Sequence, residues 1–286
     1  GAVGAGIQPG TLVKILGTST CDVMVMNNEA DLADIPGVCG IVDGSVLPGY
    51  YGIEAGQSGV GDIFLWWIRN CVPDSYGGNE EERFEKLAEA AAGQRAGEHG
   101  LLALDWNNGN RCILVDVRLT GLLLGQTLHT RAHEIYRALI EATAYGALRI
   151  IERIEEYGVP VREVVNCGGL AVKNPLLMQL YADILNRPMK ISRSDQTCAL
   201  GAAIFGAVAA GKAAGGFATV AEAQEAVCGV RETVYTPRAE NRQAYDALYA
   251  LYRELHDAFG TDRGPAPMNH VMKKLIAIRE RARAAS

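Results

Sequence analysis

The sequence predicts an α/β domain in which a mixed β-sheet is flanked by helices. Two β-rich runs within residues 11–26 are separated by a short polar turn, which predicts antiparallel pairing rather than successive βαβ units. Farther along, a short β-branched run over 161–167 ends at a glycine pair and leads into a helix. A long helix with a broad apolar stripe, predicted over 128–157, supplies a layer that covers the sheet.

Composition excludes several classes of function. The chain has 286 residues, of which 49% are hydrophobic and 21% charged, as expected for one large globular domain or two small ones. A net charge of -6 argues against nucleic acid or an anionic membrane as partner, because both attract a concentrated basic surface. No apolar run approaches the ~20 residues that a membrane span needs. Small-molecule partners are therefore favoured.

Cysteine and histidine spacing predicts neither disulfides nor a metal site. The seven cysteines are scattered singly without a Cys-x-x-Cys pair, which is typical of free thiols in a reducing cytoplasm. His129 and His133 are four residues apart on a predicted helix, but the glutamate of a zinc-protease helix is missing beside the first. A solvated helix face is the better interpretation.

The amino-terminal segment predicts no nucleotide loop of its own. Gly1–Gly6 resembles a dinucleotide-binding loop only superficially, since no strand precedes it. The chain begins without an initiator methionine, a signal peptide or a capped element, so we expect it to be the inside of a longer protein.

The first predicted turn suits a phosphate group. Gly17-Thr18-Ser19-Thr20 lies between two β-rich runs, which is the pattern of a hairpin with small hydroxylated residues at its tip. Backbone N–H groups and hydroxyls can donate to a polyphosphate, and glycine permits a close approach. An ordinary polar hairpin turn is the alternative.

An acidic residue follows the next strands. Residues 38–46 and 50–53 are predicted strands, and Glu54 stands at the end of the second, among glycines that precede an aromatic helix over 63–70. A carboxylate in this position can bind sugar hydroxyls, or it can cap the helix or remain solvated.

The middle of the chain is predicted to be largely structural. A charged amphipathic helix over 80–98 reads as a surface element, and a buried strand within 101–111 runs into a polar loop. A second strand is predicted at 112–117. Arg111 can pair with an internal acid or reach a ligand. The helix over 128–157 is core.

The glycine pair is the second candidate ligand site. Gly168 and Gly169 end the predicted strand, and Asn174 followed by Pro175 starts a helix with an N-cap side chain and a proline at the first position. This corner lets a ring or phosphate approach the backbone, with free N–H groups of a helix start facing it. A plain strand–turn–helix corner is equally compatible with the residues.

The last part of the chain predicts packing rather than chemistry. A strand is expected at 189–191, and the small residues of the helix over 198–211 predict a closely packed, buried helix beneath a site or at a domain interface. A helix over 238–259 carries an aromatic stripe typical of core. Prolines within 264–267 break it before a basic helix over 268–285, expected to be an exposed appendage.

Four motifs in order resemble the FGGY family of carbohydrate kinases over nearly the whole chain. They are Gly17-Thr-Ser-Thr20, Glu54-Ala-Gly-Gln57, Gly168-Gly-Leu-Ala-Val-Lys-Asn174 with Gln179 and Asp183, and Ala199-Leu-Gly-Ala-Ala203. The resemblance implies an RNase H-like, actin-like ATPase fold of two domains. It assigns residues 1–286 to the carboxyl-terminal, nucleotide-binding domain, with 264–286 as a helical appendage.

The resemblance also implies roles for individual residues. Glu54 matches a sugar contact. No catalytic residue and no metal ligand are expected in this chain, because the family's catalytic aspartate would lie just upstream of Gly1 and the Mg²⁺ carboxylate in the amino-terminal domain. The residues that match the family's ATP contacts are Gly17, Thr18, Ser19, Gly61, Gly168, Gly169, Lys173 and Asn174.

Within the family, the segments at 104–111 and 54–58 most resemble members that phosphorylate L-ribulose. The expected partners are ATP or ADP with Mg²⁺, L-ribulose and the chain's own amino-terminal domain, and a homo-oligomer is compatible with the sequence. The chain alone is expected to bind nucleotide weakly, if at all, and not to turn over. The alternatives are a kinase of xylulose or glycerol, and a non-catalytic actin-like nucleotide-binding module.

Overall fold

The computed structural model describes residues 1–29, 32, 34–262 and 266–270 of the chain. Of the appendage predicted at 264–286, only residues 266–270 are described. Within the described part, no helix combines the length and the apolar character needed to cross a membrane.

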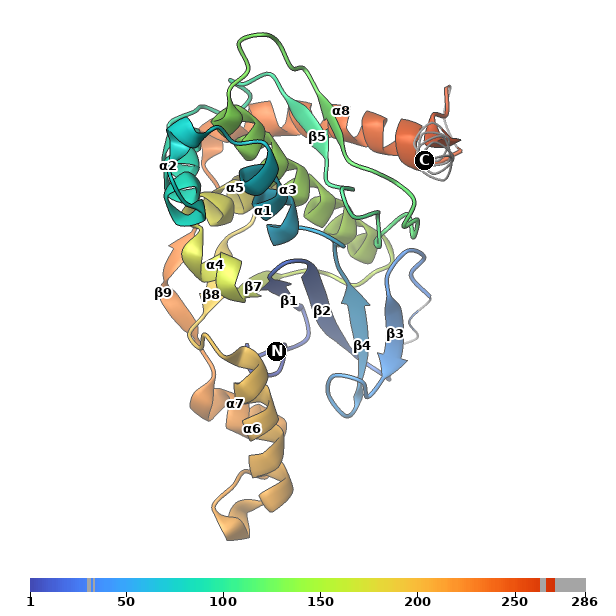
Figure 1. Ribbon diagram of the computed structural model, residues 1–286. Coiled ribbons are helices and arrows are strands. Elements are labelled where there is room, and N and C mark those ends of the chain that lie inside the picture. The colour runs from blue at the N-terminus through green and yellow to red at the C-terminus, as the bar shows by residue number, and fades with distance from the viewer. Residues whose placement is uncertain (30–31, 33, 263–265, 271–286) are drawn as a thin grey trace, which may run out of the picture.

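The core of the fold is a seven-stranded mixed sheet with the order β3-β4-β2-β1-β7-β8-β9 (Figure 1). The pairs β1–β7 and β7–β8 are parallel, and the other neighbours are antiparallel, which confirms the predicted mixed sheet. The strands are β1 (Thr11–Leu16), β2 (Thr20–Asn27), β3 (Gly40–Asp43), β4 (Tyr50–Ala55), β7 (Glu163–Cys167), β8 (Met189–Ser192) and β9 (Val230–Tyr235).

Strand direction brings distant loops to one edge of this sheet. Because β2 is antiparallel to both β1 and β4, these two strands point the same way, and β7 and β8 are parallel to β1. The carboxyl ends of β1, β4, β7 and β8 therefore share one edge, where ligands of open α/β sheets usually bind.

Most helices cover one face of the sheet, whereas α6 and α7 extend from the other side (Figure 1). A second, two-stranded sheet pairs β5 with β6. These elements are α1 (Gly61–Asn70), α2 (Glu80–Ala92), β5 (Leu102–Leu104), β6 (Leu122–Leu124), α3 (Ala132–Glu156), α4 (Gly169–Lys173), α5 (Pro175–Leu185), α6 (Thr197–Ala210), α7 (Val220–Val227) and α8 (Arg242–Gly260), with single 3₁₀ turns at Asp74–Tyr76, Lys212–Ala214 and Ala239–Asn241.

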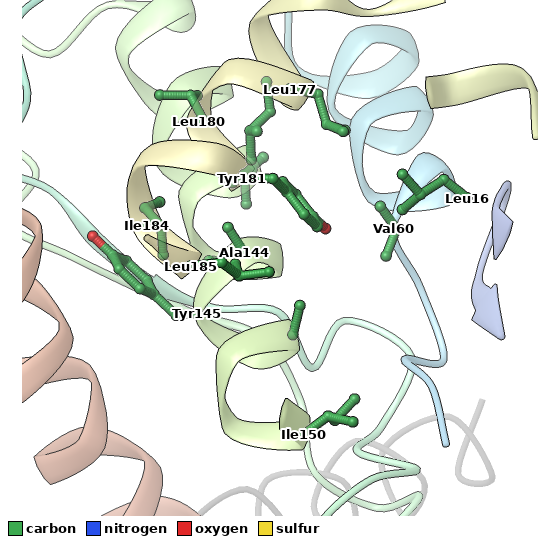
Figure 2. Packing of buried hydrophobic residues seen from close by; sticks show 14 of the residues in the cluster. Leu16, Val60, Ala144, Tyr145, Ile150, Leu177, Leu180, Tyr181, Ile184 and Leu185 are labelled. Atoms are coloured by element: carbon green, nitrogen blue, oxygen red, sulfur yellow. The ribbon is translucent and has the colours of Figure 1, made fainter. Parts of the chain in front are cut away.

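The α3 helix is the centre of the main core. It is buried along most of its length, from Ile135 to Ile154, as expected for a helix that is apolar on more than one face. Figure 2 shows its Ala144 and Tyr145 beside Tyr181 and Leu185 of α5, with Leu16 of β1 nearby. This packing fixes the helices against the sheet beneath the ends of β1 and β7.

The predicted start of α5 is confirmed. Asn174 is the N-cap, and its side-chain oxygen accepts a hydrogen bond from the Leu177 N–H at 3.0 Å, while Pro175 occupies the first helical position. The helix ends at Asn186, which adopts a left-handed conformation with φ of 51°.

Several predicted elements differ in the structure: the strand expected at 38–46 is limited to Gly40–Asp43, and the helix expected over 128–157 begins at Ala132. The prediction of a strand at 112–117 was wrong. This segment is an irregular loop held by the backbone bridge between Asn110 and Asp116. Its Val115 and Val117 are 67% and 79% exposed, so the β-branched residues of this segment did not form a half-buried strand. The strand that pairs with β5 is β6, farther along the chain. Helix α2 also ends earlier than predicted, at the Gly93 cap.

Helix α6 is close-packed at its start, as predicted, but it is not buried within this chain. A Cβ on Gly201 would lie 3.1 Å from the Gly4 backbone nitrogen, so a small residue is required there. Beyond this contact only Thr197 and Ile204 are buried, and Phe205 is 43% exposed. Helix α7 packs against one side of α6, where Leu200 and Val208 are partly buried, and the side that carries Phe205 is exposed in the described part of the chain.

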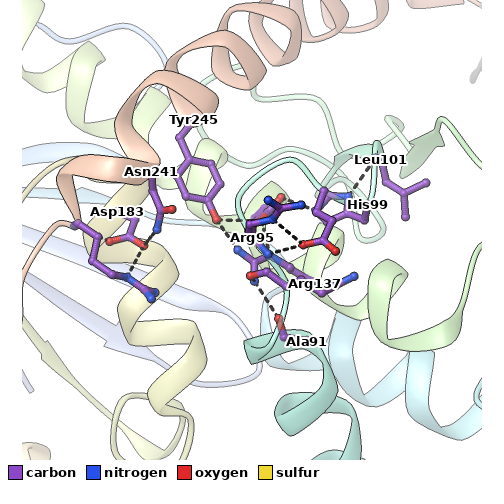
Figure 3. A network of polar contacts seen from close by, with 12 residues as sticks. Ala91, Arg95, His99, Leu101, Arg137, Asp183, Asn241 and Tyr245 are labelled. Atoms are coloured by element: carbon purple, nitrogen blue, oxygen red, sulfur yellow. Dashed lines mark hydrogen bonds and ion pairs between the residues drawn. The ribbon is translucent and has the colours of Figure 1, made fainter.

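Helix α8 packs in the core, as its aromatic stripe predicted, and it is fastened by a buried polar network (Figure 3). The Tyr245 hydroxyl donates to Glu141 at 3.0 Å and accepts from Arg137 at 2.9 Å. Arg137 also donates to Glu141 and to the Ala91 carbonyl, both at 2.8 Å, and His99 pairs with Glu141 at 3.0 Å. The network thus joins α2, α3 and α8.

Glu141 is expected to stabilise the fold in a pH-dependent way. Burial alone would raise its pKa, but hydrogen bonds from His99 and the charge of Arg137 bring the pKa below its ordinary value of 4.5. Its stabilisation is therefore fully present above that value and is lost as the pH falls through the lower folded-state pKa. Glu141→Gln should cost about 3 kcal/mol in urea unfolding near pH 7, and the difference from wild type should shrink as the pH falls below 4.5.

The matched control is Glu156→Gln on the same helix, whose carboxylate is 52% exposed beside Arg153. It should change the free energy of unfolding by about 0.5 kcal/mol or less. A cost of Glu141→Gln that stays constant down to low pH would contradict this role.

Candidate active site

The first part of the site is the hairpin between β1 and β2. Leu16 pairs with Thr20, so Gly17, Thr18 and Ser19 form the turn, as predicted. The turn is closed by a hydrogen bond from the Gly17 N–H to the Ser19 carbonyl at 3.0 Å. Thr18 is exposed at its tip.

The start of α1 is bound to this hairpin. The Gly61 N–H donates to the Gly17 carbonyl at 3.1 Å, and the Val60 and Asp62 N–H groups donate to the Thr18 carbonyl at 2.8 and 3.2 Å. A Cβ on Gly61 would lie 2.7 Å from the Gly17 carbonyl oxygen, so a larger residue would force the two segments apart. The hairpin is thus held from behind by the first turn of α1.

The glycine corner after β7, formed by Gly168 and Gly169, packs against the hairpin and the start of α1. Gly168 has φ of 91°, a conformation that favours glycine, and a Cβ there would collide with the Leu16 carbonyl oxygen at the end of β1. Helix α4 begins at once with Gly169, and the Leu170 side chain lies 3.1 Å from the point where a Gly61 Cβ would stand. The structure therefore brings the hairpin, the start of α1 and the glycine corner together.

Lys173 and Asn174 have different surroundings. Lys173 is exposed at the end of α4. Asn174 is buried, and besides its cap bond it donates to the Tyr136 hydroxyl at 3.1 Å. Burial raises the pKa of Tyr136 to about 12, which exceeds the opposite effect of that hydrogen bond, so the phenol remains protonated. In this structure the Asn174 amide positions α5 relative to α3.

Glu54 lies on the other face of the sheet from this group. Its neighbours in β4, Ile53 and Ala55, pack into the main core with the helices, so the alternation of the strand turns Glu54 outward. Its cross-strand partner Val23 packs toward the second cluster, and the Glu54 side chain is exposed. The structure thus places Glu54 near the edge where the site lies, available to a ligand on the open face.

A buried polar network lies beneath the hairpin, and the sequence patterns above did not predict it. Lys14 donates to both carboxylate oxygens of Asp22 at 2.8 Å, and both residues are fully buried. Gln57 accepts from Lys14 at 3.4 Å and donates to Asp105 and to the Thr143 carbonyl, each at 2.8 Å. The network ties β1 and β2 to the segment that leads from Glu54 to α1.

Two backbone contacts connect this network to the site. The Gln57 N–H donates to the Thr20 hydroxyl at 2.9 Å, and the Thr20 N–H donates to the Gln57 carbonyl at 3.1 Å. Burial raises the pKa of Asp105, an effect that the hydrogen bond from Gln57 opposes. Gln57 is therefore the link between the hairpin and the deep carboxylates.

A signal for this network was present in the sequence. Lys14 alternates with Leu12 and Leu16, which places a charge on the core-facing side of β1. A turn centred on Thr18 sets Lys14 opposite Asp22, the observed register. Opposite charges facing each other in a core predict a buried ion pair.

The described residues contain no group of three His, Cys, Asp or Glu side chains that could hold a metal ion. His129 and His133 do not share a helix face as predicted, because α3 begins at Ala132 and His129 lies in the turn before it, while the His133 Nδ1 pairs with the Tyr76 hydroxyl at 2.8 Å.

Comparison with known proteins identifies the family to which this chain belongs. The sequence model described as "FGGY family of carbohydrate kinases, C-terminal domain" matches residues 12–210, which contain every element of the site. The chain belongs to the FGGY family of carbohydrate kinases.

Curated relatives of this FGGY chain carry the name ribulokinase. The protein of Geobacillus thermodenitrificans is 49% identical over 284 residues, covering 98% of this chain and 49% of the relative. That of Mycolicibacterium smegmatis is 48% identical over 279 residues, covering 96% and 47%. The chain thus spans about half the length of the curated relatives it matches.

Solved structures confirm the fold. Xylulose kinase from Lactobacillus acidophilus superposes with a TM-score of 0.75 at 20% identity, over 91% of this chain and 50% of that one. Plasmodium falciparum glycerol kinase with ADP gives 0.68 at 17% identity, over 89% and 49%. The FGGY chain therefore has the actin-like ATPase fold of these sugar kinases, as the resemblance implied.

Proposed function

We propose that this chain is the ATP-binding, carboxyl-terminal half of a kinase that phosphorylates L-ribulose with MgATP. The observation that carries the proposal is the convergence of Gly17, Gly61 and Gly168 at one edge of the sheet, in a chain 49% identical to a ribulokinase. The three glycines are partly exposed and let three backbone segments pack closely at one edge of the sheet, an arrangement that suits a nucleotide.

In this proposal the hairpin holds the phosphates. The hydroxyls and backbone N–H groups of Thr18 and Ser19 donate to phosphate oxygens, while α1 holds the turn from behind. Gly168, Gly169, Lys173 and Asn174 form the adenosine side. Glu54 accepts hydrogen bonds from sugar hydroxyls on the open face. Such positioning is the main protein contribution to phosphoryl transfer.

The remaining parts of the reaction belong to the proposed amino-terminal half. A base for the attacking hydroxyl and the carboxylate for Mg²⁺ are expected there, so the 286-residue chain alone should not turn over. Mg²⁺, when bound with ATP, would neutralise charge on the phosphates. The exposed, uncharged surface of α6 around Phe205 is a natural contact for that half. A cytoplasmic location remains part of the proposal, in keeping with the free cysteines.

Thr18→Val in the two-domain kinase tests the hairpin. Removing a hydroxyl that donates to a charged phosphate should raise KM for ATP roughly tenfold, because such a bond contributes about 1.5–3 kcal/mol. KM for ribulose should stay within about twofold. The control is Thr233→Val, an exposed threonine of β9 far along the sheet from the hairpin. If both variants keep wild-type kinetics, Thr18 does not bind phosphate.

A panel of substrates separates the remaining alternatives. We expect kcat/KM of the two-domain kinase for L-ribulose to exceed its kcat/KM for xylulose and for glycerol. A non-catalytic actin-like module would bind nucleotide and phosphorylate none of them.

A further inference from the structure

Two cysteines distant in sequence meet behind the Glu54 strand. The Sγ atoms of Cys39 and Cys112 are 3.4 Å apart, although 73 positions separate the residues. Cys39 is exposed and immediately precedes β3, whereas Cys112 is buried in the loop between β5 and β6. Both are free thiols.

The pair is built into the end of β4. The Cys39 N–H donates to the Glu54 carbonyl at 2.8 Å, and the Gly56 backbone hydrogen-bonds to the Cys112 thiol. The Cys39 backbone and the Cys112 sulfur therefore contact the backbone on either side of Ala55. Any change in their spacing acts directly on the strand end that carries Glu54.

A cation lies beside the two thiols. The Arg111 guanidinium donates to the Thr20 and Gly56 carbonyls. Burial lowers the pKa of Arg111, but the neighbouring thiols Cys39, Cys21 and Cys112 outweigh burial and raise it. Arg111, Cys39 and Cys112 therefore form one cluster beside the end of β4.

We propose that Cys39 and Cys112 are a redox modification site that forms a reversible disulfide when the protein meets a hydroperoxide. The Cys39 thiolate attacks the peroxide, the O–O bond breaks, and the leaving oxygen departs as water, or as an alcohol from an organic peroxide, after protonation. The sulfur of Cys39 is oxidised to a sulfenic acid and the peroxide is reduced. Cys112 then displaces the sulfenic oxygen: the S–S bond forms, the S–O bond breaks, and hydroxide leaves with the Cys112 proton as water.

Burial and contact give the two thiols different roles in these reaction steps. Burial, followed by the neighbouring Cys39, raises the pKa of Cys112 to about 12, so Cys112 waits as a thiol behind the exposed Cys39. Closing the bond requires the sulfurs to approach by about 1.4 Å, from 3.4 Å to about 2.0 Å. Cys39 precedes the short edge strand β3, which the rest of the sheet holds on one side only.

The bond would also regulate the proposed sugar site, a consequence that rests on the proposed function. It would tie the loop around Cys112 to the Glu54 backbone and shift the carboxylate. Oxidation is therefore expected to raise KM for L-ribulose by about threefold or more in the two-domain kinase and to leave KM for ATP unchanged.

The first test is peroxide treatment of the chain followed by peptide mass spectrometry. We expect a Cys39–Cys112 cross-linked peptide that dithiothreitol reverses, in wild type and in Cys71→Ser. Cys71 is the control because it is an exposed cysteine on another element, after α1. Cys39→Ser and Cys112→Ser should not form this peptide. Cys39→Ser changes an exposed side chain and is expected to leave the fold intact, which circular dichroism checks.

Two results would overturn the site: Cys39 and Cys112 remaining thiols while Cys71 is oxidised, or Cys39 reaching the sulfinic acid without a cross-link. The kinetic measurement is read separately. A cross-link that forms without changing KM for ribulose keeps the modification site and removes its regulatory role. A kinase that uses another sugar removes the proposed function but leaves the cross-link result standing.

Discussion

Asp22→Ala is expected to lower the free energy of unfolding by about 3–5 kcal/mol, because it leaves the Lys14 ammonium buried without its carboxylate. Urea unfolding followed by circular dichroism measures this loss. The matched control is Asp246→Ala, which removes an exposed carboxylate, 54% accessible, from its pair with Arg242 and should cost about 0.5 kcal/mol or less.

The double variant Lys14→Met/Asp22→Leu distinguishes the pair from simple loss of packing. Replacing both charges with apolar side chains of similar size removes the desolvation cost, so most of the lost stability should return. Nucleotide binding should still be weaker than in wild type, because the double variant removes the Lys14 contact that orients Gln57 behind the hairpin. An Asp22→Ala variant as stable as Asp246→Ala would show that the buried pair does not support this part of the fold.

Gly168→Ala is expected to reduce ADP affinity at least tenfold. The new Cβ would be forced into the Leu16 carbonyl at the end of β1, so α4 and the glycine corner must move away from the hairpin. Isothermal titration calorimetry of the two-domain protein measures the affinity, and thermal unfolding reports any loss of stability.

Gly158→Ala is the matched control for backbone strain. Gly158 has φ of 84°, close to the 91° of Gly168, but a Cβ there would meet nothing within 4 Å. It should cost about 1 kcal/mol of stability and leave ADP binding unchanged. Equal ADP affinities in the Gly168→Ala and Gly158→Ala variants would remove the glycine corner from the nucleotide site.

The sequence supported the local parts of the site well, because each depends on short-range rules. The hairpin at Gly17–Ser19 and the α5 start at Asn174 and Pro175 follow from turn and capping preferences, and the structure confirms both. Their convergence with Gly61 was implied by the resemblance. It depends on strand order, which the residues alone did not give.

Tertiary packing overrode local preference elsewhere. Residues 112–117 are rich in β-branched side chains, yet they lack a neighbouring strand and form a loop. The uncharged, small-residue sequence of α6 correctly predicted close packing at Gly201, but most of its surface is open in this chain. Long-range contacts such as Cys39 with Cys112 could not be read from spacing, because 73 positions lie between them.

Whether this chain is one half of a ribulose kinase is decided by ribulose-dependent ADP release from MgATP, measured for the 286-residue chain and for the protein that joins it to an FGGY amino-terminal half. We expect turnover by the joined protein, with L-ribulose preferred to xylulose and glycerol, and none by the chain alone. Robust turnover by the chain alone, or a joined protein that leaves L-ribulose unphosphorylated, would contradict it.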